Sequence, residues 1–132
     1  MLLLELSDWY LFVGRFHPIL VHLPIGFLLL VGLLEVGKWS GKLTLTDDTL
    51  SFILFWSAVG ASISCVAGYA LSLGGGYEQE LLTEHQWQGI GVAALTWVIW
   101  WVKSHRAERY LPVSGLLYLP LLLFTFLLTF VA

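Results

Sequence analysis

Residues 14–26 read GRFHPILVHLPIG, a stretch that brings two histidines and two prolines to the start of a long apolar run. Pro18 suits the first position of a helix, because the N–H that proline lacks would have no partner there. The stretch therefore predicts a membrane-spanning helix that begins at Pro18, with His17 at its cap. Ionisable side chains are unfavourable inside a membrane, so both histidines are candidates for a functional site.

The composition of the whole chain supports this expectation. Apolar residues make up 58% of the 132 residues and charged residues only 11%, and the apolar residues come in long blocks. A helix needs roughly 20 residues to cross a hydrocarbon core of about 30 Å. We therefore expect one all-α domain over residues 1–132, a four-transmembrane-helix bundle with spans at about 18–36, 50–73, 86–102 and 112–132.

The segment MLLLELSDWYLFVGRF precedes the first predicted span. It lacks the basic start and the small-residue cleavage site of a removable signal peptide. Its leucines and aromatic residues, interrupted by two acidic residues, favour a short amphipathic segment at the membrane surface. An unstructured apolar leader is the alternative.

Basic residues divide unevenly between the two sides that four spans create. The first and third predicted loops contain Lys38, Lys42, Lys103, Arg106 and Arg109. Only Arg15 lies on the opposite side. Because cytoplasmic loops are enriched in lysine and arginine, these two loops are predicted to be cytoplasmic, and both termini periplasmic, in a bacterial inner membrane.

The third predicted helix carries another histidine near its start. Thr83 and Gln86 stand three residues apart, a spacing typical of a capping box, which predicts that the helix begins there with His85 in its first turn. His17, His22 and His85 then converge on the periplasmic face. Because imidazole binds several transition metals, these three residues are candidate metal ligands.

The spacing of the histidines predicts which of them face each other. His17 and His22 are five residues apart, so on one unbroken helix they are separated by about 140° around the axis. His22 precedes Gly26 by four residues and His85 precedes Gly89 by four, which places a glycine notch beside each imidazole on the same helix face. Such a pair suits a b-type haem, which predicts His22 and His85 as its ligands, with the two glycines beside the cofactor, and leaves His17 as a helix cap.

Small residues and histidines also have a purely structural interpretation. Gly60, Ser64 and Gly68 recur every four residues in the second predicted span, a pattern typical of close helix packing. Histidines near a membrane boundary often only hydrogen-bond a neighbouring helix. A packing role for the histidines therefore stays open beside the cofactor site.

Two motifs connect the chain with a known family. The segments GRFHPILVHLPIGFLLLVGLLE and HQWQGIG, with the GGGY loop between them, resemble an uncharacterised bacterial family of four-helix membrane domains marked by HPxxVHxPI and a later HxWxG. The resemblance extends over nearly the whole chain. Some members carry this domain ahead of cytochrome c modules in planctomycete-type multidomain proteins. The resemblance therefore implies a link to periplasmic redox chemistry through His17, His22 and His85.

The residues are compatible with three functions. The first is a non-enzymatic electron-transfer subunit that holds haem b, with Arg15 available to pair with a haem propionate. The second is a zinc or copper site formed by His17, His22 and His85, with Glu84 as a further zinc ligand. The third is a structural or assembly subunit of a larger membrane complex, with no cofactor.

The expected partners are the lipid bilayer and a cytochrome c or other subunits of a membrane redox complex. The sequence contains no CxxCH motif, so it is not expected to attach a c-type haem, and a cytochrome c partner is expected to be a separate chain. It has no phosphate-binding loop and no basic patch for nucleic acid. Cys65 is expected to be a buried packing residue, since a single cysteine cannot form an internal disulfide.

Overall fold

The computed structural model describes the backbone of residues 2–106 and 113–131 and the side chains of residues 8–105 and 118–129. All regular structure within these residues is helical, which confirms the all-α class. The five helices are α1 (Leu2–Gly14), α2 (His17–Trp39), α3 (Asp47–Ser72), α4 (Gln79–Arg106) and α5 (Val113–Val131). Pro112, expected to open the last helix, and Arg109 lie outside the described residues.

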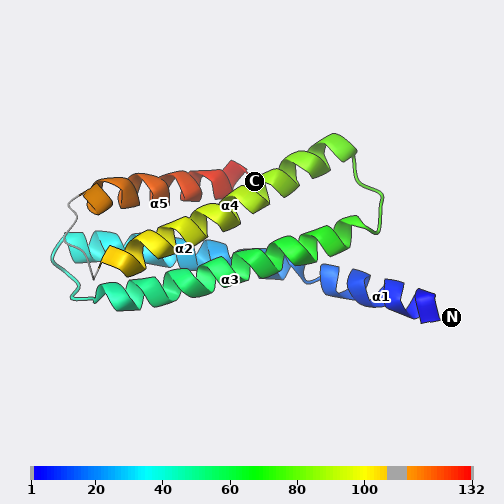
Figure 1. The fold of residues 1–132 in the computed structure, drawn as a ribbon, viewed down its shortest axis with the longest axis horizontal. Coiled ribbons are helices and arrows are strands. Elements are labelled where there is room, and N and C mark those ends of the chain that lie inside the picture. Colours follow the sequence, from blue (N-terminus) through cyan, green and yellow to red (C-terminus); the bar gives the residue numbers. More distant parts are fainter. Residues whose placement is uncertain (1, 107–112, 132) are drawn as a thin grey trace.

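Helices α2, α3 and α4 run side by side along the long axis, and α5 packs against α4 and α2 (Figure 1). α1 extends beyond α2 and packs on the end of α3. α5 reaches only about the middle of the bundle, where the C-terminus lies (Figure 1). We call the end with the α1–α2 turn and the α3–α4 connection the histidine end, and the end with the α2–α3 connection the ion-pair end.

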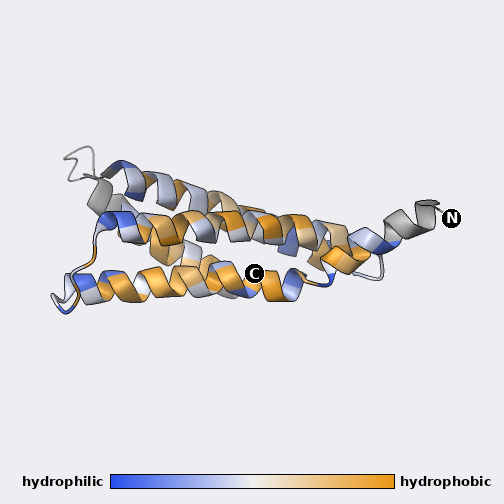
Figure 2. Cartoon of the chain, turned by 90° about the horizontal axis from the view of Figure 1, so that it is seen from below, coloured by the Kyte–Doolittle hydropathy of each residue, from blue (hydrophilic) through white to orange (hydrophobic). Residues whose placement is uncertain are grey.

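Two stretches of described helix are long and apolar enough to cross a membrane, namely Asp8–Trp39 and Asp47–Ser72. In α5 the described apolar stretch is shorter, Tyr118–Thr129. α4 contains four tryptophans and three glutamines, which make it less apolar than its neighbours. Figure 2 shows that apolar residues occupy the middle of the helices, whereas hydrophilic residues gather towards the ends.

The predicted packing seam on the second span is confirmed, and α2 is the helix that packs on it. A side chain added at Gly60 would lie 3.6 Å from the ring of Pro24. The hydroxyl of the buried Ser57 donates to the Pro24 carbonyl at 3.1 Å. Small residues on α3 therefore let α2 approach closely, and α2 continues as a helix through Pro24.

The starts of α3 and α4 are formed in different ways. The first turn of α3 contains Asp47 and Asp48, whose negative charges suit the helix dipole, and the Thr46 hydroxyl caps the helix by accepting from the Thr49 N–H at 3.3 Å. The capping box predicted at Thr83 is wrong. α4 already begins at Gln79, and the Thr83 hydroxyl donates to the Gln79 carbonyl inside the helix at 2.7 Å, which places His85 in the second turn.

The segment before the first span is helical and is anchored to the bundle, so the unstructured alternative is wrong. A side chain at Gly14, where α1 ends, would lie 2.7 Å from the backbone nitrogen of Leu71 on α3. The aromatic rings of Trp9, Phe12 and Phe16 stack edge to face on the exposed side. Such an aromatic ridge is consistent with the predicted interfacial segment.

The ion-pair end contains a buried charged residue that was predicted from the sequence to lie in a loop. Lys103 lies within α4 and is only 2% exposed. Its ammonium group lies 2.6 Å from Glu35 on α2 and 2.9 Å from Asp47 on α3, and Lys38 also pairs with Asp47 at 2.5 Å. The prediction that Lys103 is a loop residue is wrong, because two carboxylates from neighbouring helices compensate its charge inside the bundle.

Candidate functional site

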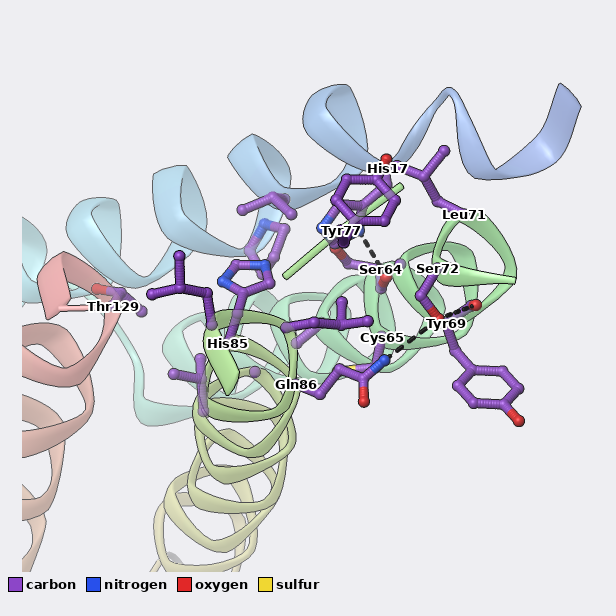
Figure 3. Close-up of a pocket in the computed structure, with 18 of the residues that line it drawn as sticks. His17, Ser64, Cys65, Tyr69, Leu71, Ser72, Tyr77, His85, Gln86 and Thr129 are labelled. Atoms are coloured by element: carbon purple, nitrogen blue, oxygen red, sulfur yellow. Dashed lines mark hydrogen bonds between the residues drawn. The ribbon is translucent and has the colours of Figure 1, made fainter. Parts of the chain in front are cut away.

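Two histidines from different helices face each other at the histidine end. His17 is the first residue of α2, and His85 lies in the second turn of α4 (Figure 3). Their ring centres are 6.0 Å apart and the ring planes are nearly perpendicular, at 88°. The periplasmic cluster expected from the sequence therefore contains one close pair of histidines, His17 and His85.

His17 is held by the C-terminal part of α3. Its Nδ1 lies 2.9 Å from the Ser64 carbonyl oxygen and 3.3 Å from the Ser64 hydroxyl (Figure 3). Phe16, not His17, is the residue that precedes the helix, and the helix start has no side-chain cap. The prediction that His17 serves as a cap is therefore wrong, and its side chain points into the bundle instead.

His22 does not take part in this pair. Its side chain is exposed, and its Nδ1 contacts the carbonyl of Pro18 one turn back on its own helix. The prediction that His22 faces His85 is wrong for a geometric reason. α2 is one continuous helix, so the angle of about 140° between His17 and His22 directs one ring to the interior and the other away from it.

A cavity of about 580 Å³ adjoins the histidine pair. It lies among α2, α3 and α4, and the end of α5 reaches it through Thr129 (Figure 3). The walls are predominantly apolar, with Val21, Pro24, Ala61, Leu82 and Val92 among them.

Polar groups line one side of this cavity and tie α4 to α3. Gln86 donates to the Ser72 hydroxyl at 3.2 Å, and Ser72 donates to the Tyr69 carbonyl at 2.7 Å (Figure 3). The side chains of Tyr77 and Glu78, from the connection before α4, also line it. This hydrogen-bonded wall fixes the position of the helix turn that carries His85.

The predicted glycine notches are only partly found. A side chain at Gly26 would meet nothing within 4 Å, and Gly26 lies on the exposed side of α2. Gly89 does line the cavity, where an added side chain would lie 3.8 Å from the sulfur of Cys65. The prediction for Gly26 is wrong for the same reason as that for His22, because these two residues share one helix face.

The tightest notch at the site belongs to Gly68 on α3. A side chain there would lie 2.8 Å from Cε1 and 2.9 Å from Nδ1 of His17. The sequence identified Gly68 only as part of a packing seam. The signal that could have found it is its depth along the helix, since Ser64 and Gly68 lie near the histidine end of the second predicted span, as His17 lies near that end of the first.

The remaining candidate residues lie away from the pair. Arg15 is exposed in the α1–α2 turn and does not line the cavity, so the expected propionate partner is not placed at this site. Glu84 is exposed and does not line it either. Cys65, expected as a buried packing residue, is half-buried and contributes to the cavity wall.

Comparisons with known proteins add no relative to this description. No protein-family model matches the chain, and no curated protein or solved structure matches it significantly. The chemistry of the site must therefore be inferred from its own residues. Those residues are two facing imidazoles beside an apolar cavity.

Proposed function

We propose that the protein is an integral membrane electron-transfer subunit that binds one b-type haem through His17 and His85. The observation that carries this proposal is the facing pair of imidazoles beside the cavity. This ligand pair replaces the pair His22 and His85 that the sequence favoured.

The separation of the two rings fits axial ligation of one metal. A metal ion held in line between two imidazoles sets their ring centres about 6 Å apart, since a metal–nitrogen bond is about 2 Å long and each nitrogen lies about 1 Å from its ring centre. The observed separation of His17 and His85 is 6.0 Å. The two residues therefore fit the spacing that a bis-histidine haem requires.

The cavity favours haem over a bare metal ion. Pockets that hold cofactors typically measure about 300–1,000 Å³ and are mostly apolar, as this one is. Among the described residues, no group of three or more His, Cys, Asp or Glu side chains could hold a metal ion. Structural zinc requires about four protein ligands. Haem supplies four ring nitrogens itself and needs only two histidines from the chain.

The side chains around the pair would have distinct tasks toward such a group. A haem bound by two histidines carries one electron as its iron changes between ferric and ferrous states. His17 and His85 would hold the iron, and the apolar side chains of Val21, Pro24 and Val92 would keep water away from the group. Because the protein itself would supply both of these ligands, such a group would transfer electrons rather than bind a substrate, which supports a non-enzymatic function.

We further propose that α2, α3, α4 and α5 all span a bacterial inner membrane. The histidine end would face the periplasm, because Lys38, Lys42 and Lys103 lie towards the opposite end. The pairing of Lys103 with Glu35 supports a span for α4 despite its charge, since a paired charge is far less costly in a bundle. Both termini would then be periplasmic.

A periplasmic haem near the membrane surface would exchange electrons with a cytochrome c or with another subunit of a membrane redox complex. The exposed edge of the cavity, near Tyr77 and Glu78, supports such an exchange because it brings the site close to a partner's surface. A cofactor-free structural subunit is the competing function. It would use the same histidines only for packing.

The decisive experiment is a reduced-minus-oxidised visible spectrum of the protein purified from its native membrane, with metal analysis of the same sample. The proposal predicts the sharp bands of a low-spin b-type haem and close to one iron per chain. Stoichiometric zinc or copper without haem would overturn it in favour of a metal-ion site. Well-folded protein with neither would overturn it in favour of the structural subunit.

A further inference from the structure

The ring of His17 lies in a notch on the surface of α3. The notch exists because residue 68 is glycine, since an added side chain would lie 2.8 Å from Cε1, 2.9 Å from Nδ1 and 3.3 Å from Nε2 of the imidazole. Three ring atoms of His17 therefore pack directly against the backbone of α3. A side chain larger than hydrogen at residue 68 would therefore displace the ring.

The contact between His17 and α3 defines the protonation of the ring. Nδ1 lies 2.9 Å from the carbonyl oxygen of Ser64. A carbonyl oxygen only accepts hydrogen bonds, so Nδ1 must carry the hydrogen. In the neutral imidazole the lone pair is then on Nε2, and Nε2 becomes the nitrogen that can bind a metal.

Gly68 explains why a helix carbonyl is available for this bond. In an α-helix each side chain leans towards the N-terminus and covers the turn before its own Cα. A side chain at residue 68 would therefore cover the turn that contains the Ser64 carbonyl. Its absence leaves that oxygen, which has two lone pairs, open to the Nδ1–H of His17.

We propose that Gly68 and the Ser64 carbonyl together fix His17 as the Nδ1–H tautomer and orient Nε2 as its ligand nitrogen. Metal-binding histidines almost always donate their other ring N–H to a carbonyl or carboxylate, which sets the tautomer and strengthens the ligand. Gly68 is thus a positioning residue for His17. The tautomer stands on the contacts alone, whereas its use toward haem rests on the proposed function.

The fixed tautomer can be measured without any haem. Protein labelled with 15N-histidine and reconstituted in lipid nanodiscs would give imidazole nitrogen shifts by NMR, with His17 assigned through the signal that His17→Gln removes. At a pH above the titration of histidine, the expected result is a protonated Nδ1 and an unprotonated Nε2. A protonated Nε2 at His17 in the wild-type protein would overturn the proposal.

Substitutions test the positioning residue itself. Gly68→Ala should displace the ring and abolish the single Nδ1–H state, because its methyl group would lie where His17 packs. Gly26→Ala is the matched control, since it adds the same methyl group to α2 with nothing within 4 Å. Ser64→Ala removes only the hydroxyl at 3.3 Å and keeps the carbonyl, so the tautomer should persist. An unchanged His17 signal in Gly68→Ala would overturn the proposal.

Haem binding separates this inference from the proposed function. If haem binds, Gly68→Ala should weaken it by roughly 10–100-fold, as loss of an outer partner of a metal ligand typically does, and Gly26→Ala should not. Equal haem affinity in the two variants would overturn the positioning of His17 for a ligand. A wild-type Nδ1–H tautomer in a protein that binds no haem would refute the proposed function while leaving the fixed tautomer intact.

Discussion

The two ends of the bundle differ in what surrounds their polar side chains. At the ion-pair end, Lys103 is buried between Glu35 at 2.6 Å and Asp47 at 2.9 Å. At the histidine end, the rings of His17 and His85 face each other beside a cavity of about 580 Å³. Paired charges therefore fill the interior of the ion-pair end, whereas the histidine end contains a cavity.

The difference separates what the fold needs from what a ligand would need. Glu35, Asp47 and Lys103 come from α2, α3 and α4, so one cluster fixes the register of three helices. The ring centre of Tyr118 on α5 lies 4.8 Å from the Lys103 nitrogen, so the cluster also contacts a fourth helix. A cavity, by contrast, forfeits packing contacts. Its presence at the end that carries the histidines supports a binding function there.

The largest effect on stability is expected at the ion-pair end. Lys103→Met should lower the free energy of unfolding by about 3–5 kcal/mol, because it leaves the largely buried Glu35 carboxylate without its lysine partner. Unfolding by SDS in mixed micelles would measure this loss. The double variant Lys103→Met with Glu35→Gln should recover most of it, since Asp47 keeps Lys38 at 2.5 Å. A loss below 1 kcal/mol in the single variant would contradict the structural importance of this cluster.

A smaller loss is expected midway between the two ends. Ser57→Ala removes the buried hydrogen bond from the Ser57 hydroxyl to the Pro24 carbonyl. This bond should contribute about 1 kcal/mol to the free energy of unfolding in the same assay. The exposed Ser40, whose hydroxyl donates to the Gly37 carbonyl at the end of α2, provides the control Ser40→Ala with little change. Equal effects of the two variants would argue against close α2–α3 packing at Pro24.

The smallest effect is expected at the rim of the ion-pair end. Lys38→Ala breaks a pair with Asp47 in which both side chains are about a third exposed. Exposed pairs contribute about 0.2–1 kcal/mol, and Asp47 would keep Lys103. The SDS-unfolding midpoint should therefore fall only slightly and should shift less with added salt than in the wild type. A loss as large as that of Lys103→Met would contradict the distinction between buried and rim charges.

The apolar blocks of the sequence predicted the helices well because helix position follows from local composition. The blocks predicted at 18–36 and 50–73 correspond to His17–Trp39 and Asp47–Ser72. The partners of the histidines could not be predicted in this way. They depend on the rotation of each helix about its axis, which tertiary packing of Pro24 on Gly60 and of His17 on Gly68 determines.

Two further features could not be predicted from local sequence patterns, for the same reason. Lys103 looks like a loop residue because a lysine ends an apolar block, and only its carboxylate partners on α2 and α3 make burial favourable. The spacing of His85 and Gly89 correctly predicted that both residues lie at the site, because both line the cavity. Its apparent copy in His22 and Gly26 falls on an exposed helix face, so similar sequence spacing did not mean similar surroundings.

The most direct test compares the haem content of His17→Ala, His22→Ala and His85→Ala in native membranes, with protein level and SDS-unfolding midpoint measured for each. If His17 and His85 bind haem at the histidine end, the b-type spectrum should be lost in His17→Ala and His85→Ala and fully retained in His22→Ala. Loss in His22→Ala with retention in His17→Ala, or retention in all three, would contradict it.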